Sequence, residues 1–188
     1  MDPIAALDAS AARVVQLVGQ VDRSQWSRAT PCADWNVREL VGHLIATMLG
    51  HVDLLHGAPA SDLATLIQQQ ALAGGNDLLT AVADAATAVR AAFTEPGALE
   101  RTVHHFIGDV PGSRLLDIRT TENVLHGWDL STALGLPATI DDALADHVYQ
   151  YLAPRAELLP STGYYAPPKR TPATDAGVQE RLLALAGR

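Results

Sequence analysis

Several residue types are scarce in this sequence, and each scarcity excludes a class of protein. The chain has one cysteine, Cys32, in 188 residues, so it cannot form an internal disulfide, and a cytoplasmic location is the simplest expectation. Aromatic residues make up only 5% of the chain, whereas hydrophobic residues reach 48%. That balance is typical of a folded protein built from helices rich in alanine and leucine.

Basic residues are also in the minority. The chain has 13 Lys and Arg against 21 Asp and Glu, which gives a formal net charge of -8. Because a negatively charged chain is repelled by phosphate backbones, we do not expect a nucleic-acid partner. The sequence has no uncharged apolar run long enough to cross a bilayer, and the segment MDPIAALDAS lacks the basic region of a signal peptide. We therefore expect no membrane partner.

Apolar residues recur at intervals of three or four in four long segments, which predicts amphipathic helices. These segments are residues 3–19, 36–57, 77–93 and 113–134, and shorter helices are expected at 61–70, 141–153 and 175–186. The second long segment begins at Asn36 with Glu39 three residues later, the arrangement of a capping box. Before the fourth, RTVHHFIGDVPGSR has β-branched and aromatic residues beside turn signals, so we expect a long loop or a short strand pair.

We interpret this pattern as an all-α fold. The four long helices would form a four-helix bundle, with a short loop or strand insertion before the fourth helix and a small C-terminal helical extension. The predicted division is a bundle domain at residues 1–155 and a tail at residues 156–188 whose short helix packs on the bundle.

Two polar residues share one face of the fourth long helix, in the segment TENVLHGWDL. Glu122 and His126 are four residues apart, so their side chains can converge on one ion. A third ligand must come from another helix, and His43 is the best candidate because apolar residues flank it on the second long helix. Two imidazoles and a carboxylate suit Zn²⁺, Ni²⁺ or Fe²⁺ better than Ca²⁺ or Mg²⁺, and three ligands leave room for water or substrate.

A Glu-x-x-x-His spacing is weak by itself, because it often arises by chance. One alternative is a bundle without metal, in which Glu122 and His126 form a pair on the helix surface. A histidine on an apolar face, such as His43, is also more often a core residue than a ligand when it stands alone. The independent pair on a second helix favours the metal site.

The other histidines are weaker candidates. We expect His51 and His56 to face solvent near the end of the second long helix and His147 to lie on a helix surface. In a strand, His104 and His105 would point to opposite sides, so at most one of them could reach the site.

Two arginines and one aspartate near these motifs are further candidates for a role in the site. Arg119, three residues before Glu122, is a candidate to bind an anionic substrate or the carboxylate of a thiol, as is Arg114, and the alternative is a solvated arginine. Asp129, three residues after His126, is a candidate to accept a hydrogen bond from it, and the alternative is a local pair or cap.

Cys32 lies in a Pro-Cys-Ala loop and is expected to be a small buried filler, not a nucleophile. Trp35 and Trp128 are expected to pack in the core. Tyr164 and Tyr165 would either cover the mouth of the pocket or belong to a simply packed tail.

Two segments together resemble a known family. TPCADWNVRELVGHL at 30–44 and ENVLHGWDLSTALG at 122–135 are similar to the mycothiol-dependent maleylpyruvate isomerase N-terminal domain family, within the DinB-like superfamily. The resemblance implies a DinB-like bundle with a metal held by a histidine of the second helix and a glutamate and histidine of the fourth, which are His43, Glu122 and His126 here. It also implies a low-molecular-weight thiol, mycothiol in actinobacteria, as a co-substrate.

We therefore predict a divalent-metal-binding protein that acts as a thiol-dependent isomerase or S-transferase on a small electrophilic substrate. Zinc is the favoured ion, with nickel or iron as alternatives. A bound ion would lower the pKa of a coordinated thiol, and the thiolate would attack an electrophilic carbon. A non-catalytic metal-binding or sensor protein of the same fold is a second class that stays open. Because helix bundles often associate through their faces, a homodimer is a further expectation.

Overall fold

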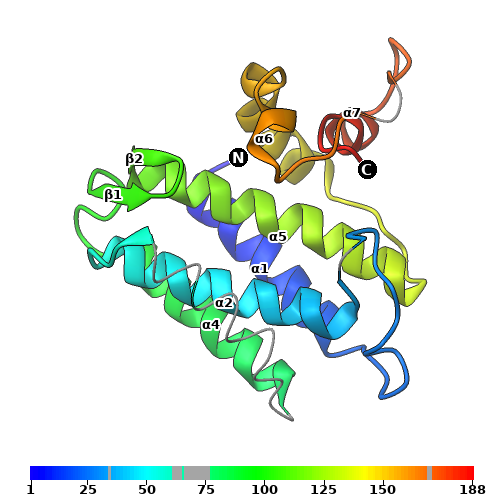
Figure 1. Ribbon diagram of the computed structural model, residues 1–188, viewed down its shortest axis with the longest axis horizontal. Helices are drawn as coiled ribbons and strands as arrows, with labels where there is room; N and C mark the ends of the chain where they lie inside the picture. The colour runs from blue at the N-terminus through cyan, green and yellow to red at the C-terminus, as the bar shows by residue number, and fades with distance from the viewer. Residues whose placement is uncertain (34, 61–64, 66–76, 169–170) are drawn as a thin grey trace.

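The main body of the protein is a bundle of long helices, as the all-α interpretation predicts. The computed structural model describes residues 1–33, 35–60, 65, 77–168 and 171–188. The bundle helices are α1 (Pro3–Val18), α2 (Val37–Leu55), α4 (Leu78–Phe93) and α5 (Gly112–Leu134). Helices α1 and α2 each pack against both α4 and α5, which closes a four-helix arrangement (Figure 1). The helix expected at 61–70 lies, apart from residue 65, outside the described residues.

The four bundle helices begin at or close to the predicted residues, and side chains cap the N-termini of α1, α2 and α4. The Asn36 side chain accepts a hydrogen bond from the Glu39 amide at 3.1 Å, and the Glu39 carboxylate accepts one from the Asn36 amide at 2.8 Å. This is the predicted capping box, and it satisfies amides that would otherwise be unpaired at the start of α2. The C-terminus of α5 is closed by Gly135 in the left-handed conformation, with a φ of 72°.

A short β-hairpin precedes α5, which confirms the strand pair as the structure of that segment. Strands β1 (Thr102–His105) and β2 (Gly108–Pro111) are antiparallel, and Val103 is paired with Val110. Side chains alternate between faces as they must in a strand, so Val103 and His105 are buried while His104 is exposed. Gly112 follows at once, and a Cβ at this position would lie 1.9 Å from the Ala98 carbonyl oxygen. The chain can therefore enter α5 here only with glycine.

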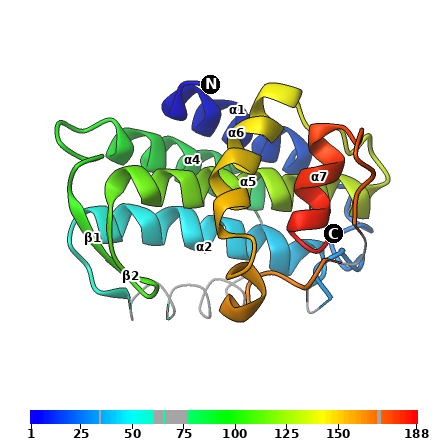
Figure 2. The ribbon, with the colours of Figure 1, turned by 90° about the horizontal axis from the view of Figure 1, so that it is seen from above.

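The C-terminal residues form a second layer on the bundle. Helix α6 (Asp142–Leu152) crosses α5, the short 3-10 helices η1 (Ala153–Arg155) and η2 (Leu159–Thr162) follow, and α7 (Val178–Leu185) packs against α6 (Figure 2). We call residues 142–188 the C-terminal layer. One apolar core lies between the four bundle helices, and a second lies between α5 and this layer. The division into units at residue 155 stays a prediction.

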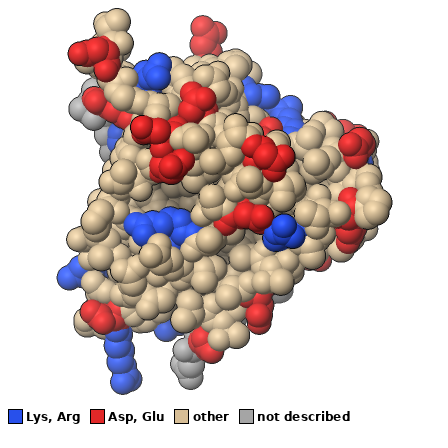
Figure 3. Space-filling model, turned by 180° about the vertical axis from the view of Figure 1, so that it is seen from behind, with Lys and Arg blue, Asp and Glu red and all other residues tan. Residues whose placement is uncertain are grey.

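The surface agrees with the acidic composition. Seen from behind, acidic and basic groups are scattered over broad neutral areas, and the described residues form no wide basic patch on this face (Figure 3). Among the helices that the structure describes, none is both long enough and apolar enough to span a bilayer.

Candidate functional site

The structure brings His43 and His126 together across the contact between α2 and α5. Their ring centroids are 5.2 Å apart, and the rings meet edge to face at 82°. Glu122 precedes His126 by one turn of α5. Within the described residues, His43 Nδ1 is buried without a hydrogen-bond partner, and Glu122 Oε2 is buried beside Arg119. These are donor atoms of the kind that a metal ion binds.

Glu122 carries its charge beside a buried arginine. Arg119 is completely buried, its Nη1 lies 3.0 Å from Glu122 Oε2, and the same nitrogen donates to Thr47 Oγ1 at 2.6 Å. Burial opposes ionisation of Glu122, but Arg119 and the surrounding histidines outweigh it and lower its pKa to about 2. The group therefore stands as a carboxylate at neutral pH, as a metal ligand must.

Arg119 is not the solvated arginine of the alternative interpretation. Its Nη1 donates a hydrogen bond to Thr47 and forms an ion pair with Glu122. Its Nε and Nη2 are buried without a hydrogen-bond partner among the described residues. Its role in binding a substrate anion stays a prediction. Arg114 also has a buried Nε without such a partner.

His43 sits under an aromatic ring. The Trp35 ring centroid is 4.4 Å from that of His43 and 5.9 Å from that of His126, so Trp35 covers both imidazoles in addition to packing on the core. Burial, and then the neighbouring His126, lowers the pKa of His43 to about 3. The imidazole is thus neutral at physiological pH, which is the form that binds metals.

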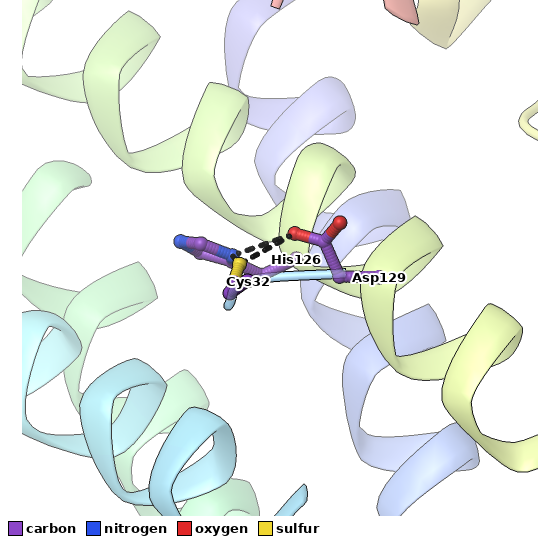
Figure 4. Close-up of side chains that lie close together, drawn as sticks. All are labelled: Cys32, His126 and Asp129. Carbon is purple, nitrogen blue, oxygen red and sulfur yellow. Dashed lines mark hydrogen bonds and ion pairs between the residues drawn. The ribbon is translucent and has the colours of Figure 1, made fainter. Parts of the chain in front are cut away.

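On its other side, His126 belongs to a hydrogen-bonded cluster with Asp129 and Cys32 (Figure 4). His126 Nδ1 donates to Asp129 Oδ2 at 3.1 Å, and Cys32 Sγ donates to the same oxygen at 3.2 Å. The Arg188 guanidinium donates two hydrogen bonds to the fully buried Asp129 carboxylate, from Nη2 to Oδ2 at 2.7 Å and from Nε to Oδ1 at 3.1 Å. A histidine held in this way at Nδ1 presents Nε2 in a fixed direction.

Two different sets of ligands therefore share His126. Within the described residues, Cys32, His126 and Asp129 place ligand atoms within 4.8 Å of one another, and the three predicted ligands are not gathered as tightly. However, the Arg188 guanidinium already pairs with Asp129 and lies 3.6 Å from Cys32 Sγ, where it would repel a cation. Burial and Asp129 also raise the pKa of the Cys32 thiol to about 12. The Cys32 cluster is thus better suited to orient His126 than to bind an ion.

The donor types of the other set do fit a transition metal. His43 is a neutral imidazole whose buried Nδ1 has no hydrogen-bond partner among the described residues, and Glu122 is a carboxylate whose charge is balanced by Arg119. An ion would draw these side chains somewhat closer than they lie here.

The expectation for His51 is wrong. His51 is only 1% exposed, and its ring centroid lies 6.2 Å from that of His105. The reason is that α2 is packed between α4 and α5 and also touches β1, so its buried surface is wider than one apolar stripe. His105 is buried and His104 is exposed, so one of this pair faces inward, and His56 is exposed as expected.

The expectation for His147 also needs correction. Its side chain is 14% exposed, and its Nε2 is buried 3.6 Å from Asp117 Oδ1 on α5. This follows from α6 packing across α5, which the helical pattern of α6 by itself does not reveal.

Sequence reasoning gave Cys32 the wrong surroundings and missed Arg188 altogether. Cys32 packs against the core but also bonds to Asp129, so it is more than an apolar filler. Arg188 lies 59 residues from Asp129 in the sequence, and no local pattern links the two. Tyr165 is half-buried, and burial together with Glu122 raises its pKa, whereas Tyr164 is exposed with its ring centroid 5.3 Å from that of Phe106.

This chain is similar to known proteins in sequence and in fold. Two uncharacterized proteins of Mycobacterium tuberculosis, from strains CDC 1551 and H37Rv, are 30% identical over 145 residues, which is 77% of this chain and 74% of theirs. Two crystal structures, of a mycothiol-dependent maleylpyruvate isomerase and of a histidine-to-alanine mutant, superpose with a TM-score of 0.70 at 18% and 16% identity. Each superposition covers 86% of this chain and 71% of the isomerase, and it establishes a common fold.

A protein-family model also matches this chain. The match extends over residues 7–131, which includes most of α1, all of α2, α4 and the hairpin, and most of α5. All three predicted metal ligands and Asp129 fall within this range. This chain therefore belongs to the mycothiol maleylpyruvate isomerase N-terminal domain family.

Proposed function

We propose that this protein is a thiol-dependent isomerase or S-transferase in which His43, Glu122 and His126 hold a divalent transition metal, preferably zinc. The observation that carries the proposal is the meeting of His43 and His126, whose ring centroids are 5.2 Å apart on adjacent helices, beside the ionised Glu122. Nitrogen and carboxylate ligands in this number suit a catalytic zinc site, and nickel or iron would also accept them.

The surrounding residues support such a site by orienting the ligands. Asp129 holds His126 through Nδ1, and Arg188 holds Asp129. Arg119 holds Glu122 from the inner side and is itself held by Thr47. The Trp35 ring packs against the His43 ring, with centroids 4.4 Å apart. Ligands fixed in this way lose little freedom when an ion binds, which favours affinity.

The name of the family and of the solved isomerases supports mycothiol as the co-substrate. A bound divalent ion lowers the pKa of a coordinated thiol and polarises a carbonyl oxygen. In an isomerisation, the thiolate adds to a conjugated double bond, the new single bond rotates, and the thiolate leaves, so no atom is gained or lost. In a transfer, the thioether stays on the product. The buried, unpaired Nε and Nη2 of Arg119 are suited to a carboxylate on either partner.

Metal analysis of the purified protein tests the ligand assignment. We expect about one zinc per wild-type chain, and a clear loss of metal in His43→Ala and Glu122→Ala. The control is His56→Ala, which removes an exposed histidine that follows the same helix. Equal metal content in all four proteins would refute the assignment.

A second candidate is a non-catalytic metal-binding or sensor protein. It rests on the same fold and the same three ligands, neither of which requires turnover. Thiol-dependent turnover separates the two candidates. With the metal bound, consumption of maleylpyruvate or of another small electrophile only when mycothiol is present would support the enzyme. Metal binding without turnover of any electrophile would support the sensor.

A further inference from the structure

A second cavity, separate from the three predicted metal ligands, lies on another side of α5. It has a volume of about 400 Å³ and is enclosed by α1, α5, α6 and the connection from α5 to α6. Asn123 and Gly127 line it, and each follows a predicted metal ligand by one residue. One residue turns a helix by about 100°, so these two face α1 and α6, whereas Glu122 and His126 face α2. The volume is within the range of small-molecule sites.

Small residues keep this cavity open. Gly127 contributes no side chain, and a Cβ built there would meet only Val14 Cγ2, at 3.9 Å. Ala9 lines the opposite wall on α1. Close packing of α1 against α5 therefore does not require the glycine. The space beside Gly127 is available to a ligand.

The floor of the cavity carries an unsatisfied acceptor. Asn123 is 1% exposed, and its Nδ2 donates to Ser10 Oγ at 3.3 Å, while that hydroxyl donates to the Leu7 carbonyl at 2.9 Å. The Asn123 Oδ1 has no hydrogen-bond partner within the described part of the chain. A buried carbonyl oxygen without a donor costs free energy, which a ligand hydroxyl or amine would recover.

The rim carries a cation without an acidic partner. Arg13 Nη2 donates to the Pro137 carbonyl at 3.1 Å and to Ser131 Oγ at 3.4 Å, and Nη1 donates to Gln16 Oε1 at 2.9 Å. All three acceptors are uncharged, and Arg13 makes no ion pair with a described residue. The one acidic residue at the rim, Asp141, is engaged by the Ala143 and Leu144 amides of α6. Arg13 can therefore accept an anionic group.

We propose that this cavity binds a small organic monoanion with a flat apolar body, a carboxylate and one hydroxyl or amine donor. The carboxylate would pair with Arg13, and the donor would bond to Asn123 Oδ1. Val124, Trp128, Ile140 and Leu144 supply apolar walls for the body, and Trp128 offers an aromatic face.

Binding of para-hydroxyphenylacetate to the purified protein, measured by calorimetry, tests this proposal. We expect saturable binding. Phenylacetate lacks the hydroxyl, and para-hydroxyphenethyl alcohol lacks the carboxylate. The affinity for each should be lower by about tenfold or more. Arg13→Gln should lose the preference for the acid over the alcohol, and Asn123→Leu should lose the preference for the hydroxylated acid. Arg23→Gln, an exposed arginine outside the cavity, should behave as wild type.

Two variants locate the bound molecule. Gly127→Leu fills the cavity and should reduce binding about tenfold or more, whereas His43→Ala should leave binding unchanged. If Gly127→Leu does not fold, as judged by circular dichroism, Ala9→Leu fills the cavity from α1 instead. Absence of saturable binding by the wild type would overturn the proposal. So would binding that His43→Ala abolishes and the cavity-filling variants retain, since the ligand would then sit at the metal site.

Discussion

At the scale of single residues, His126 joins two polar clusters. Its Nδ1 is held by Asp129, which also bonds to Cys32 and Arg188, while its ring meets His43 edge to face on the side of α2. The first cluster fixes the direction of the ring, and the second contains the predicted ligands. Asp129 is therefore the residue whose loss should alter the site without removing a ligand.

We expect Asp129→Asn to lower zinc affinity about 10-fold to 100-fold, because an amide cannot hold the His126 N–H as a carboxylate does. Competition with a chromophoric chelator measures this. The matched control is Asp117→Asn, which alters another carboxylate on α5 that lies near a histidine, His147. Affinities that are equal in both variants would contradict the proposed role of Asp129.

His51 shows how burial changes the titration of a side chain. Burial lowers its pKa from 6.5 to about 3. Between these values the unfolded chain binds a proton that the folded chain does not. The contribution of neutral His51 to stability is thus complete above pH 6.5 and is lost as the pH falls toward 3.

Replacing His51 by leucine should make the free energy of unfolding less dependent on pH in this window, by up to about 1.4 kcal/mol per pH unit. The slope should be reduced, not abolished, since burial also lowers the pKa of His43 and His105. Urea denaturation across the window, with a chelator present, gives the slopes. His56→Leu, an exposed histidine, is the comparison, and identical slopes for His51→Leu and wild type would count against the effect.

At the scale of elements, α5 is unusual because much of its buried surface is polar. The buried polar residues of this helix are Arg119, Thr120, Thr121, Asn123, Asp129 and Ser131. Its apolar residues predicted a helix, but they did not predict that polar groups would face the bundle and the C-terminal layer alike. Helix α2, by contrast, has a conventional apolar face and a strong start signal, so its beginning could be predicted closely.

Helix α2 positions His43 through its capping box. Asn36→Ala removes the acceptor for the Glu39 amide, and we expect a loss of about 1 kcal/mol in the free energy of unfolding. Thr87→Ala is a suitable control, because this exposed threonine of α4 bonds only to the Ala83 carbonyl. Urea denaturation gives the free energy of unfolding of both variants. If Asn36→Ala is as stable as Thr87→Ala, the cap contributes nothing measurable.

At the scale of the whole molecule, the C-terminal layer contributes directly to the candidate site. It packs on α5 through its own apolar core, and Arg188 reaches from it to the buried Asp129. The layer therefore acts as a support for His126 in addition to covering α5. A homodimer stays a prediction, which light scattering would test.

Arg188→Ala leaves the Asp129 carboxylate buried without its cationic partner, and we expect a loss of about 3 kcal/mol or more in the free energy of unfolding. Arg188→Lys keeps the charge but loses the paired bonds, so its stability should be intermediate. Urea denaturation measures both, and amide exchange in α7 reports whether the layer loosens. An Arg188→Ala variant with wild-type stability would show that the pair is not needed to hold the layer.

Local patterns in the sequence were enough to predict the long helices and to name the residues that two of them contribute to the candidate site. Spacing of apolar residues and capping signals depends only on neighbours along the chain, so α1, α2, α4 and α5 could be predicted. For the hairpin, the same signals left a long loop and a short strand pair both open. The same local geometry put Glu122 and His126 on one face. The apolar residues around His43 on a second helix made it the best candidate for a third ligand, and the family resemblance implied the same three residues.

The tertiary structure decided which segments meet. Burial of His51, the bonds of Cys32 to Asp129, and the reach of Arg188 across 59 residues all depend on how helices pack, and the sequence pattern carries no distances between distant segments. The cavity between α1, α5 and α6 has the same origin, because it exists only where three helices meet around small residues.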